Sequence, residues 1–137
     1  MARLRSIVFD CSRPSELASF WAEGLGYKLR PYTDEDIAML RTAGIEDVAD
    51  DPNVVIDPPT PGAPTIWFNR GPETKTVKNR LHLDLDLEDQ SEFDHLIDAG
   101  ATVVEEVNRN GHGWTVMADP EGNEFCAFID RAKGAGP

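Results

Sequence analysis

The chain of 137 residues is 40% hydrophobic, which suffices for one domain that buries roughly two-thirds of its unfolded surface. Its 25 acidic and 13 basic residues give a net charge of −12, which argues against nucleic acid and anionic membranes as partners and mildly favours neutral or cationic ligands. No apolar run reaches the roughly 18 residues of a membrane span, and the N-terminus lacks an apolar signal region, so we expect a cytoplasmic protein. Two distant cysteines form no disulfide framework.

The first half of the chain predicts a strand, a helix and then further strands. Residues 5–10 alternate apolar and polar side chains, as in a half-buried strand. A helix is expected from Ser12 and Pro14 to residues 24–26, with Leu17, Phe20 and Trp21 inward. The acidic residues 33–50 fit either a short helix or a loop flap. The remaining strands are expected at residues 27–32, 53–57 and 65–69.

The second half repeats this order. Residues 81–87 place leucine at every second position, which predicts a strand with one apolar and one polar face. The next helix is expected to open at Glu88-Asp89 and to end at Gly100, with Phe93, Leu96 and Ile97 inward. Further strands are expected at residues 102–107, 114–118 and 124–129, with a linker at 71–79 and a frayed tail at 131–137.

The two halves follow one plan. Residues 5–26 lie over residues 81–102 at a constant offset of 76 without a gap. Asp57-Pro58 matches Asp119-Pro120 at an offset of 62, so the first copy is 14 residues longer (76 − 62), an excess that fits the acidic segment. The sequence therefore predicts a single α+β domain, 1–137. Two βαβββ modules, at about residues 4–70 and 80–130, would form a curved mixed sheet around a central cleft.

Three stretches carry a resemblance to a known family. They are residues 78–85 (Lys-Asn-Arg-Leu-His-Leu-Asp-Leu), residues 119–126 (Asp-Pro-Glu-Gly-Asn-Glu-Phe-Cys), and Phe20-Trp21 before Gly24-Leu25-Gly26-Tyr27. With its doubled module, the chain resembles the vicinal oxygen chelate superfamily, which includes glyoxalase I, extradiol dioxygenases and bleomycin-resistance proteins. Within it, the chain resembles the glyoxalase-like domain proteins over about residues 4–129. The resemblance implies the fold more than an activity, because the superfamily hosts several chemistries and some pure binders.

The resemblance also implies where a metal ion would bind. Metal-dependent members place one ligand early in the first strand and one in the last strand of each module, and these side chains converge on a divalent ion. The matching positions are His82 and Cys126 in the second module and Ser6 and, as the polar candidate, Asn69 in the first. Since a catalytic metal normally needs several His or carboxylate ligands, no tightly bound metal is favoured. If a divalent metal binds, the expected ligands are His82 and Glu124, which shares the strand face of Cys126.

Candidate binding and catalytic residues lie on the polar strand face that lines the cleft in related proteins. His82 and Asp84 are the tentative catalytic pair, with His82 as general base, ligand donor or relict metal ligand. His82 and Cys126 each also have an alternative, purely structural role. His82 could form a hydrogen bond across the sheet, and Cys126 could be an inert buried thiol. Aromatic walls suit a flat or apolar ligand, although core packing also explains aromatic residues. The expected ligand-binding residues are Trp67, Asn69, Trp114 and Cys126.

Residues 119–123 are predicted to form a turn. Pro120 fixes φ, while Gly122 and Asn123 accept positive φ, so this motif indicates the fold rather than an activity. Asp10 and Asp86 are expected on the same sheet face as His82, where they solvate strand ends or attract a cation.

Three functional hypotheses follow. The first is a small-molecule binder with a degenerate metal site, comparable to the resistance proteins, which holds a neutral or cationic aromatic or carbonyl ligand in the cleft. The second is a metal-dependent lyase, isomerase or dioxygenase that acts on a substrate with vicinal oxygens. The third is a metal-free enzyme that uses His82 and Asp84 as acid–base groups on a carbonyl compound. The resemblance further implies a homodimer.

Overall fold

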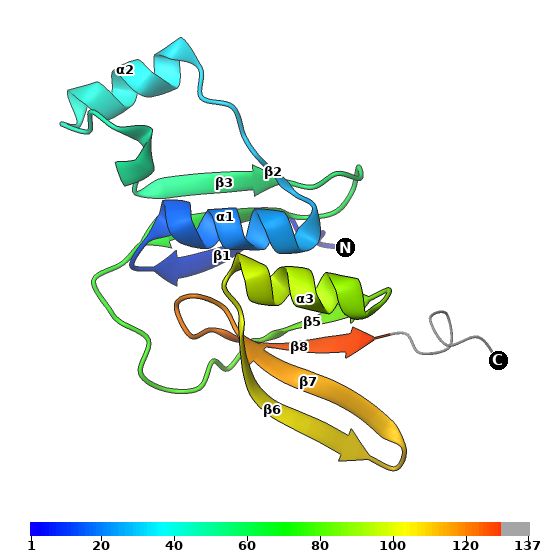
Figure 1. Ribbon diagram of the computed structural model, residues 1–137. Coiled ribbons are helices and arrows are strands. Elements are labelled where there is room, and N and C mark those ends of the chain that lie inside the picture. Colours follow the sequence, from blue (N-terminus) through cyan, green and yellow to red (C-terminus); the bar gives the residue numbers. More distant parts are fainter. Residues whose placement is uncertain (130–137) are drawn as a thin grey trace. The chain divides into compact units, whose positions relative to one another are not determined.

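The computed structural model describes residues 1–129, so the tail predicted at 131–137 lies outside the described residues. The chain divides into two compact units: Met1–Thr74, and a second unit that begins at Lys75, inside the predicted linker. Each unit contains one four-stranded mixed sheet with its helices (Figure 1). The α+β class and the two βαβββ modules are confirmed, and the expected mixed sheet is present as one sheet in each unit. Within residues 1–129, no helix has both the length and the apolar character that a membrane crossing requires.

The first unit follows the predicted order. Its strands are arranged β1-β4-β3-β2, with β1 parallel to β4 and the other neighbours antiparallel. The strand expected at 27–32 is only two residues long; the chain soon reaches Pro31, which has no N–H for a sheet ladder. The elements are β1 (Ser6–Cys11), α1 (Pro14–Leu25), β2 (Lys28–Leu29), α2 (Asp34–Thr42), the 3-10 helix η1 (Val48–Asp50), β3 (Asn53–Asp57) and β4 (Thr65–Arg70).

Helix α1 packs on β3 and β4 and supplies much of the core of the first unit (Figure 1). Pro14 occupies the first turn, where its missing N–H leaves no helical hydrogen bond unmade, and Gly26 ends the helix with φ of 69°. Leu17 and Trp21 are 0% and 1% exposed, respectively. The ring centroids of Trp21 and of Phe9 on β1 are 5.5 Å apart. The predicted inward face of this helix is therefore confirmed.

The acidic segment that the sequence left open contains a helix. Thr33 and Asp36 form a capping box at the start of α2. The Asp36 N–H donates to the Thr33 hydroxyl at 3.1 Å, and the Thr33 N–H donates to the Asp36 carboxylate at 2.9 Å. Acidic residues in the first turn also suit the positive end of the helix dipole. No residue of α2 is buried, which explains why the apolar pattern was too weak to decide between helix and loop.

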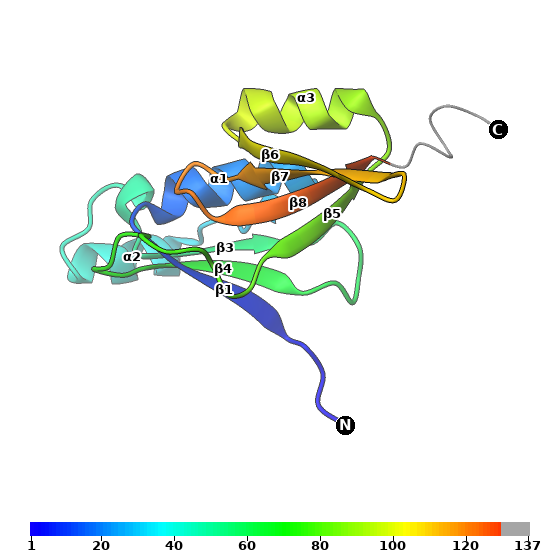
Figure 2. The same ribbon diagram turned by 90° about the horizontal axis from the view of Figure 1, so that it is seen from below.

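The second unit has the strand order β5-β8-β7-β6, again with its first and last strands parallel. Figure 2 shows α3 along one face of this sheet. Strands β6 and β7 run past their predicted ends to a hairpin at Asn110-Gly111, whose φ values of 54° and 79° suit the turn type that such hairpins favour. The elements are β5 (Leu83–Leu87), α3 (Gln90–Ala99), β6 (Thr102–Arg109), β7 (His112–Ala118) and β8 (Glu124–Ile129).

Helix α3 is anchored by its cap and by one buried leucine. Asp89 accepts hydrogen bonds from the N–H groups of Ser91 and Glu92 at 2.9 and 3.2 Å. Leu96 is 1% exposed, as predicted, whereas Ile97 is 38% exposed, so its predicted inward orientation is wrong. Consecutive side chains of a helix point about 100° apart. When Leu96 faces the core, the side chain of Ile97 therefore points away from it.

These neighbouring residues give a test of the orientation of α3. Leu96→Ala deletes a side chain that is 1% exposed, so we expect the free energy of unfolding to fall by about 2–5 kcal/mol. Ile97→Ala, at 38% exposure, should cost about 1 kcal/mol or less. Urea unfolding of the wild type and both variants, followed by circular dichroism, measures the difference. Equal losses in the two variants would contradict the orientation described.

Candidate functional site

The parallel pairing of β5 with β8 brings polar residues from two distant segments onto one sheet face. Asp84 is the Cα partner of Cys126 in this ladder. Their strand neighbours Leu85 and Phe125 point to the opposite face, because side chains alternate along a strand. His82 lies immediately before β5, which begins at Leu83, so its predicted position inside the strand is wrong. Its side chain nevertheless lies beside that of Asp84.

His82, Asp84 and Cys126 form a compact cluster of potential ligand atoms. Nδ1 of His82 lies 3.9 Å from Oδ1 of Asp84, and one donor atom from each residue lies within 4.8 Å of the others. The side chains of His82 and Asp84 are 41% and 63% exposed, while Cys126 is half-buried. Burial, followed by the charge and hydrogen bond of Asp84, raises the pKa of the Cys126 thiol, and Lys78 opposes this rise. The side chains of the predicted acid–base pair, His82 and Asp84, thus lie close to each other, and the thiol of Cys126 lies beside them.

The two ladders show which residues of the modules correspond. In the first unit Val8 pairs with Trp67, and in the second Asp84 pairs with Cys126. Since Val8 and Asp84 are related by the offset of 76 (84 − 8), Trp67 is the counterpart of Cys126. Asn69, which the sequence suggested for that place, lies two residues further along β4.

The donor set of the second unit fits a divalent metal ion, whereas residues 1–74, all of which the structure describes, contain no comparable set. Imidazole, carboxylate and thiolate are all accepted by Zn²⁺, and the separations within 4.8 Å are only slightly wider than the roughly 3–4 Å between ligands of a bound ion. The three corresponding positions of the first unit are occupied by Ser6, which offers a hydroxyl, and by Val8 and Trp67, which offer no ligand atom. An ion bound by His82, Asp84 and Cys126 would supply Lewis acidity that polarises a ligand oxygen.

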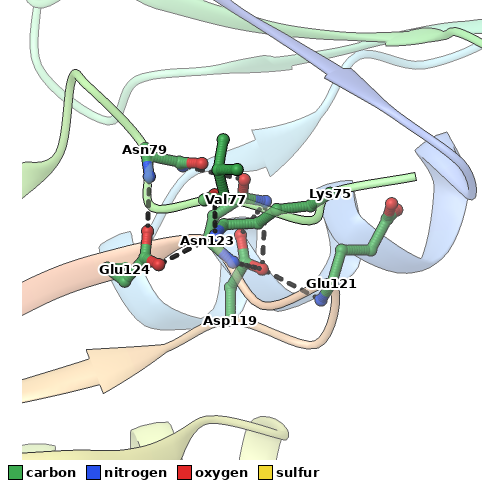
Figure 3. A network of polar contacts seen from close by, with 7 residues as sticks. All are labelled: Lys75, Val77, Asn79, Asp119, Glu121, Asn123 and Glu124. Atoms are coloured by element: carbon green, nitrogen blue, oxygen red, sulfur yellow. Dashed lines mark hydrogen bonds and ion pairs between the residues drawn. The ribbon is translucent and has the colours of Figure 1, made fainter. Parts of the chain in front are cut away.

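Glu124, the other predicted metal ligand, is engaged in a different network. Its Oε1 accepts a hydrogen bond from Nζ of Lys75 at 2.8 Å, and its Oε2 accepts one from the N–H of Asn79 at 2.9 Å (Figure 3). The side chains of Lys75 and Glu124 are only 19% and 18% exposed. Glu124 shares the strand face of Cys126, as predicted, but the cluster found among residues 1–129 does not include it.

This network attaches the segment before β5 to the start of β8. Nζ of Lys75 also donates to the carbonyl of Val77 at 2.7 Å, and the Asn79 amide donates to Oδ1 of Asn123 at 2.9 Å (Figure 3). Half of the predicted linker is therefore held in place by side-chain contacts. Because His82 follows Asn79 by three residues, the network restricts where the imidazole can lie.

The turn between β7 and β8 is built on Asp119. This carboxylate is 3% exposed, and its Oδ1 accepts hydrogen bonds from the N–H groups of Glu121 and Asn123 at 2.9 and 3.0 Å. Gly122 has φ of 87°, as predicted for the turn. Asn123 is not among the described residues with positive φ, so that part of the prediction is wrong. Its side-chain amide instead donates to both oxygens of Asp119.

Trp67 lines a pocket of about 380 Å³ that lies within the first unit. Val55 and Trp67 come from the sheet. Met39 and Leu40 come from α2, and Ile45 from the segment that follows it. The acidic insertion of the first copy therefore supplies one wall of the pocket.

Charged and polar groups around this pocket are paired with one another. The guanidinium of Arg30 binds both carboxylate oxygens of Asp57 at 2.7 and 3.0 Å and lies 5.8 Å from the ring centroid of Trp67. The hydroxyl of Tyr32 donates to Asp51, which is 7% exposed, at 2.7 Å. Burial and then this hydrogen bond raise the pKa of Tyr32, so its phenol stays neutral at physiological pH.

The other predicted ligand-binding residues are not among those that line this pocket. Trp114 lines a pocket of about 430 Å³ in the second unit together with Phe93 and Glu106, and its ring stacks on Phe128 with centroids 5.7 Å apart. Asn69 is not among the lining residues of the Trp67 pocket; its Oδ1 accepts a hydrogen bond from the amide of Asn53, which does line it.

Sequence reasoning missed several residues of these sites. Lys75 and Asn79 lie in the predicted linker, and the sequence signals a role only for Asn79, which belongs to one of the family-like stretches. Arg30, Tyr32 and Asp51 had no local signal. Their partners are set by the β2–β3 register and by the path of the chain around α2, neither of which the periodicity of residues determines.

Comparisons with known proteins agree on one fold. The sequence model described as "Glyoxalase-like domain" matches residues 6–128. A comparison with curated protein sequences gives no match.

Solved structures with the same fold share little sequence with this chain. A glyoxalase/bleomycin resistance protein/dioxygenase family enzyme from Burkholderia phytofirmans PsJN is 20% identical with a TM-score of 0.62, covering 92% of this chain and 97% of that one. A glyoxalase-related enzyme from Fulvimarina pelagi is 12% identical, with a TM-score of 0.62 and coverage of 96% and 91%. The fosfomycin resistance protein FosX from Listeria monocytogenes, as a mutant complexed with Mn(II) and a dihydroxypropylphosphonic acid, is 8% identical, with a TM-score of 0.64 and coverage of 97% and 95%.

The Glu124 network predicts a pH-dependent stability. Burial alone would raise the pKa of Glu124, but the hydrogen bonds from Lys75 and Asn79 and the charge of Lys75 lower it from 4.5 to about 2. Because the folded pKa lies below the unfolded one, this stabilisation is complete above about pH 4.5 and is lost as the pH falls toward about 2. At neutral pH, Glu124→Gln should lower the free energy of unfolding by about 1–3 kcal/mol, allowing for partial solvent screening.

Urea unfolding at several pH values measures this effect. The difference between the wild type and Glu124→Gln should shrink as the pH falls below 4.5. The matched control is Glu105→Gln on the exposed part of β6, which should change stability by about 0.5 kcal/mol or less. A loss that is independent of pH, or no larger than that of the control, would refute the role assigned to Glu124.

Proposed function

Since the chain belongs to the glyoxalase-like domain family, we propose that it binds a small neutral or cationic molecule with an aromatic or carbonyl group in the Trp67 pocket of the first unit. The observation that carries the proposal is the pocket itself. An indole from β4 faces aliphatic side chains of the α2 segment across a space of about 380 Å³. Membership of the family does not select this function, because one fold hosts several activities.

The size and walls of the pocket support an apolar or aromatic ligand. Small-molecule sites typically have volumes of roughly 300–1,000 Å³ and mostly apolar linings with a few polar groups. This pocket lies at the lower end of that range. A flat ring placed against Trp67 would gain from stacking and from contact with Met39 and Ile45.

The charges around the pocket support a neutral or cationic ligand. Asp36 and Asp51 line it, and Asp57 binds the guanidinium of Arg30. The surroundings of the pocket thus contain three carboxylates and one cationic group. An anionic ligand would have to displace Asp57 from Arg30 or lie near the remaining carboxylates. The net charge of −12 acts in the same direction over a longer range.

A second candidate function rests on the cluster of His82, Asp84 and Cys126. A metal-dependent lyase, isomerase or dioxygenase needs an ion with an open position for a substrate with vicinal oxygens, and three protein ligands leave such a position. The structural similarity to FosX, which was crystallised with Mn(II), favours this candidate only at the level of the fold. Without a metal, His82 and Asp84 would act as an acid–base pair on a carbonyl compound.

The family resemblance also motivates the expectation of a homodimer, and the cytoplasmic location expected from the sequence is retained as a proposal. Size-exclusion chromatography with light scattering measures the mass in solution, and a mass near twice 15.1 kDa is the expected result.

The binding proposal predicts a specific effect of Trp67→Ala. We expect neutral and cationic aromatic or carbonyl compounds to raise the melting temperature of the wild type, while their carboxylate analogues do not. For the compounds that bind, Trp67→Ala should weaken the affinity by roughly five- to thirtyfold, which corresponds to about 1–2 kcal/mol of lost stacking and burial. Titration followed by the fluorescence of the remaining tryptophans gives the affinity.

Two further variants control this experiment. Met39→Ala changes the opposite wall at a side chain that is 72% exposed, so it should weaken binding without a large loss of stability. Trp114→Ala removes the tryptophan of the other pocket and should leave the affinity unchanged. Ligands that bind all three variants as tightly as the wild type, or a preference for anionic compounds, would rule out the proposed pocket.

A turnover assay separates the binder from the two enzyme readings. If the protein only binds small molecules, a panel of 2-oxoaldehyde, hydroxycarbonyl and catechol compounds should not be converted, with or without added Zn²⁺ or Mn²⁺. Metal-dependent conversion that His82→Ala abolishes would favour the second candidate. Conversion that survives a chelator but not His82→Ala would favour the metal-free enzyme.

A further inference from the structure

We propose that the second unit binds a zinc-class divalent ion through its own residues His82, Asp84 and Cys126. This donor set shares His82 and Cys126 with the positions that the family resemblance implies, but its third ligand is Asp84 rather than Ser6 or Asn69 of the first module. The inference is independent of the small-molecule pocket proposed above, which lies in the first unit.

The three donors are placed together by backbone geometry. His82 and Asp84 are two residues apart in an extended segment, so their side chains lie on the same side. Asp84 and Cys126 are direct partners in the parallel ladder of β5 and β8. The distance of 3.9 Å from Nδ1 to Oδ1, and the limit of 4.8 Å for the whole set, require only side-chain rotation to close around an ion.

The backbone that carries these donors is held in place on both sides. Cys126 lies within β8 between Phe125 and Ala127, which are 0% and 2% exposed and fix the strand against the core. The segment before His82 is attached to Glu124 through Lys75 and Asn79. A site built on a held backbone loses less conformational entropy when it binds an ion than a site on a free loop.

The chemistry of the donors selects the ion. A thiolate favours Zn²⁺ and other borderline or soft ions, whereas Mg²⁺, Ca²⁺ and Mn²⁺ prefer sites made of oxygen ligands. With His82 and Asp84 41% and 63% exposed, the ion would keep at least one position open to water or to an oxygen or sulfur donor of a ligand.

Titration of metal-free protein with Zn²⁺ and Co²⁺ alone tests the proposal. Isothermal titration calorimetry should show one Zn²⁺ per chain, with Mn²⁺ and Mg²⁺ at least about tenfold weaker. Co²⁺ should produce the near-ultraviolet charge-transfer absorption of a cobalt–thiolate bond together with visible bands. This spectrum reports the thiolate directly and requires no activity.

Matched variants assign the ligands. Cys126→Ser should abolish the cobalt–thiolate absorption, and His82→Ala and Asp84→Asn should each weaken Zn²⁺ by at least about tenfold. Asp84 is 63% exposed, so Asp84→Asn provides a readout even if another variant folds poorly. The controls Cys11→Ala, His112→Ala and Asp86→Asn, which alter the other cysteine, an exposed histidine and the next aspartate of the same strand face, should bind as the wild type does.

Three results would overturn the inference. They are the absence of Zn²⁺ binding, a cobalt spectrum without the thiolate band, and a Zn²⁺ affinity that Cys126→Ser and Asp84→Asn leave unchanged. Tight Zn²⁺ binding with no ligand in the Trp67 pocket would support the metal site while refuting the proposed small-molecule function, so the two proposals fail separately.

Discussion

The parallel pairing of the first strand with the last strand is the constraint on which the rest of each unit depends. Parallel neighbours cannot be joined by a tight turn, so the intervening chain must cross over, and in both units a helix covers the sheet on the way. The pairing places residues from the two ends of a module side by side, as with Asp84 and Cys126. Both the cluster in the second unit and the position of Trp67 in the first follow from this single feature.

The two copies use equivalent positions for different chemistry. Where the second unit carries Asp84 and Cys126, the first carries Val8 and Trp67, which offer an apolar surface in place of ligand atoms. The first unit also contains the acidic insertion, whose helix α2 lines a pocket together with Trp67. One copy thus has the features of an apolar binding site and the other those of a cation site.

Glu124 shows why the residue type and the strand face are insufficient to identify a ligand. It lies on the same face of β8 as Cys126, as alternation predicts, and a carboxylate there would suit a metal ion. Its two oxygens are instead occupied by Lys75 and by the N–H of Asn79. In that role it holds the chain segment before β5, and because these contacts lower its pKa, the network stabilises the folded state at neutral pH.

The sequence by itself determined the features that depend on neighbouring residues. Alternation and helical periodicity predicted both modules, and local chemistry predicted the helix end at Gly26 and the turn around Gly122. The tertiary structure decided which residues meet: Trp67 rather than Asn69 as the counterpart of Cys126, the partners of Glu124, and the exposure of Ile97. The physical reason is that periodicity fixes the face of a side chain, whereas strand register and hydrogen-bond partners depend on segments far apart in the chain.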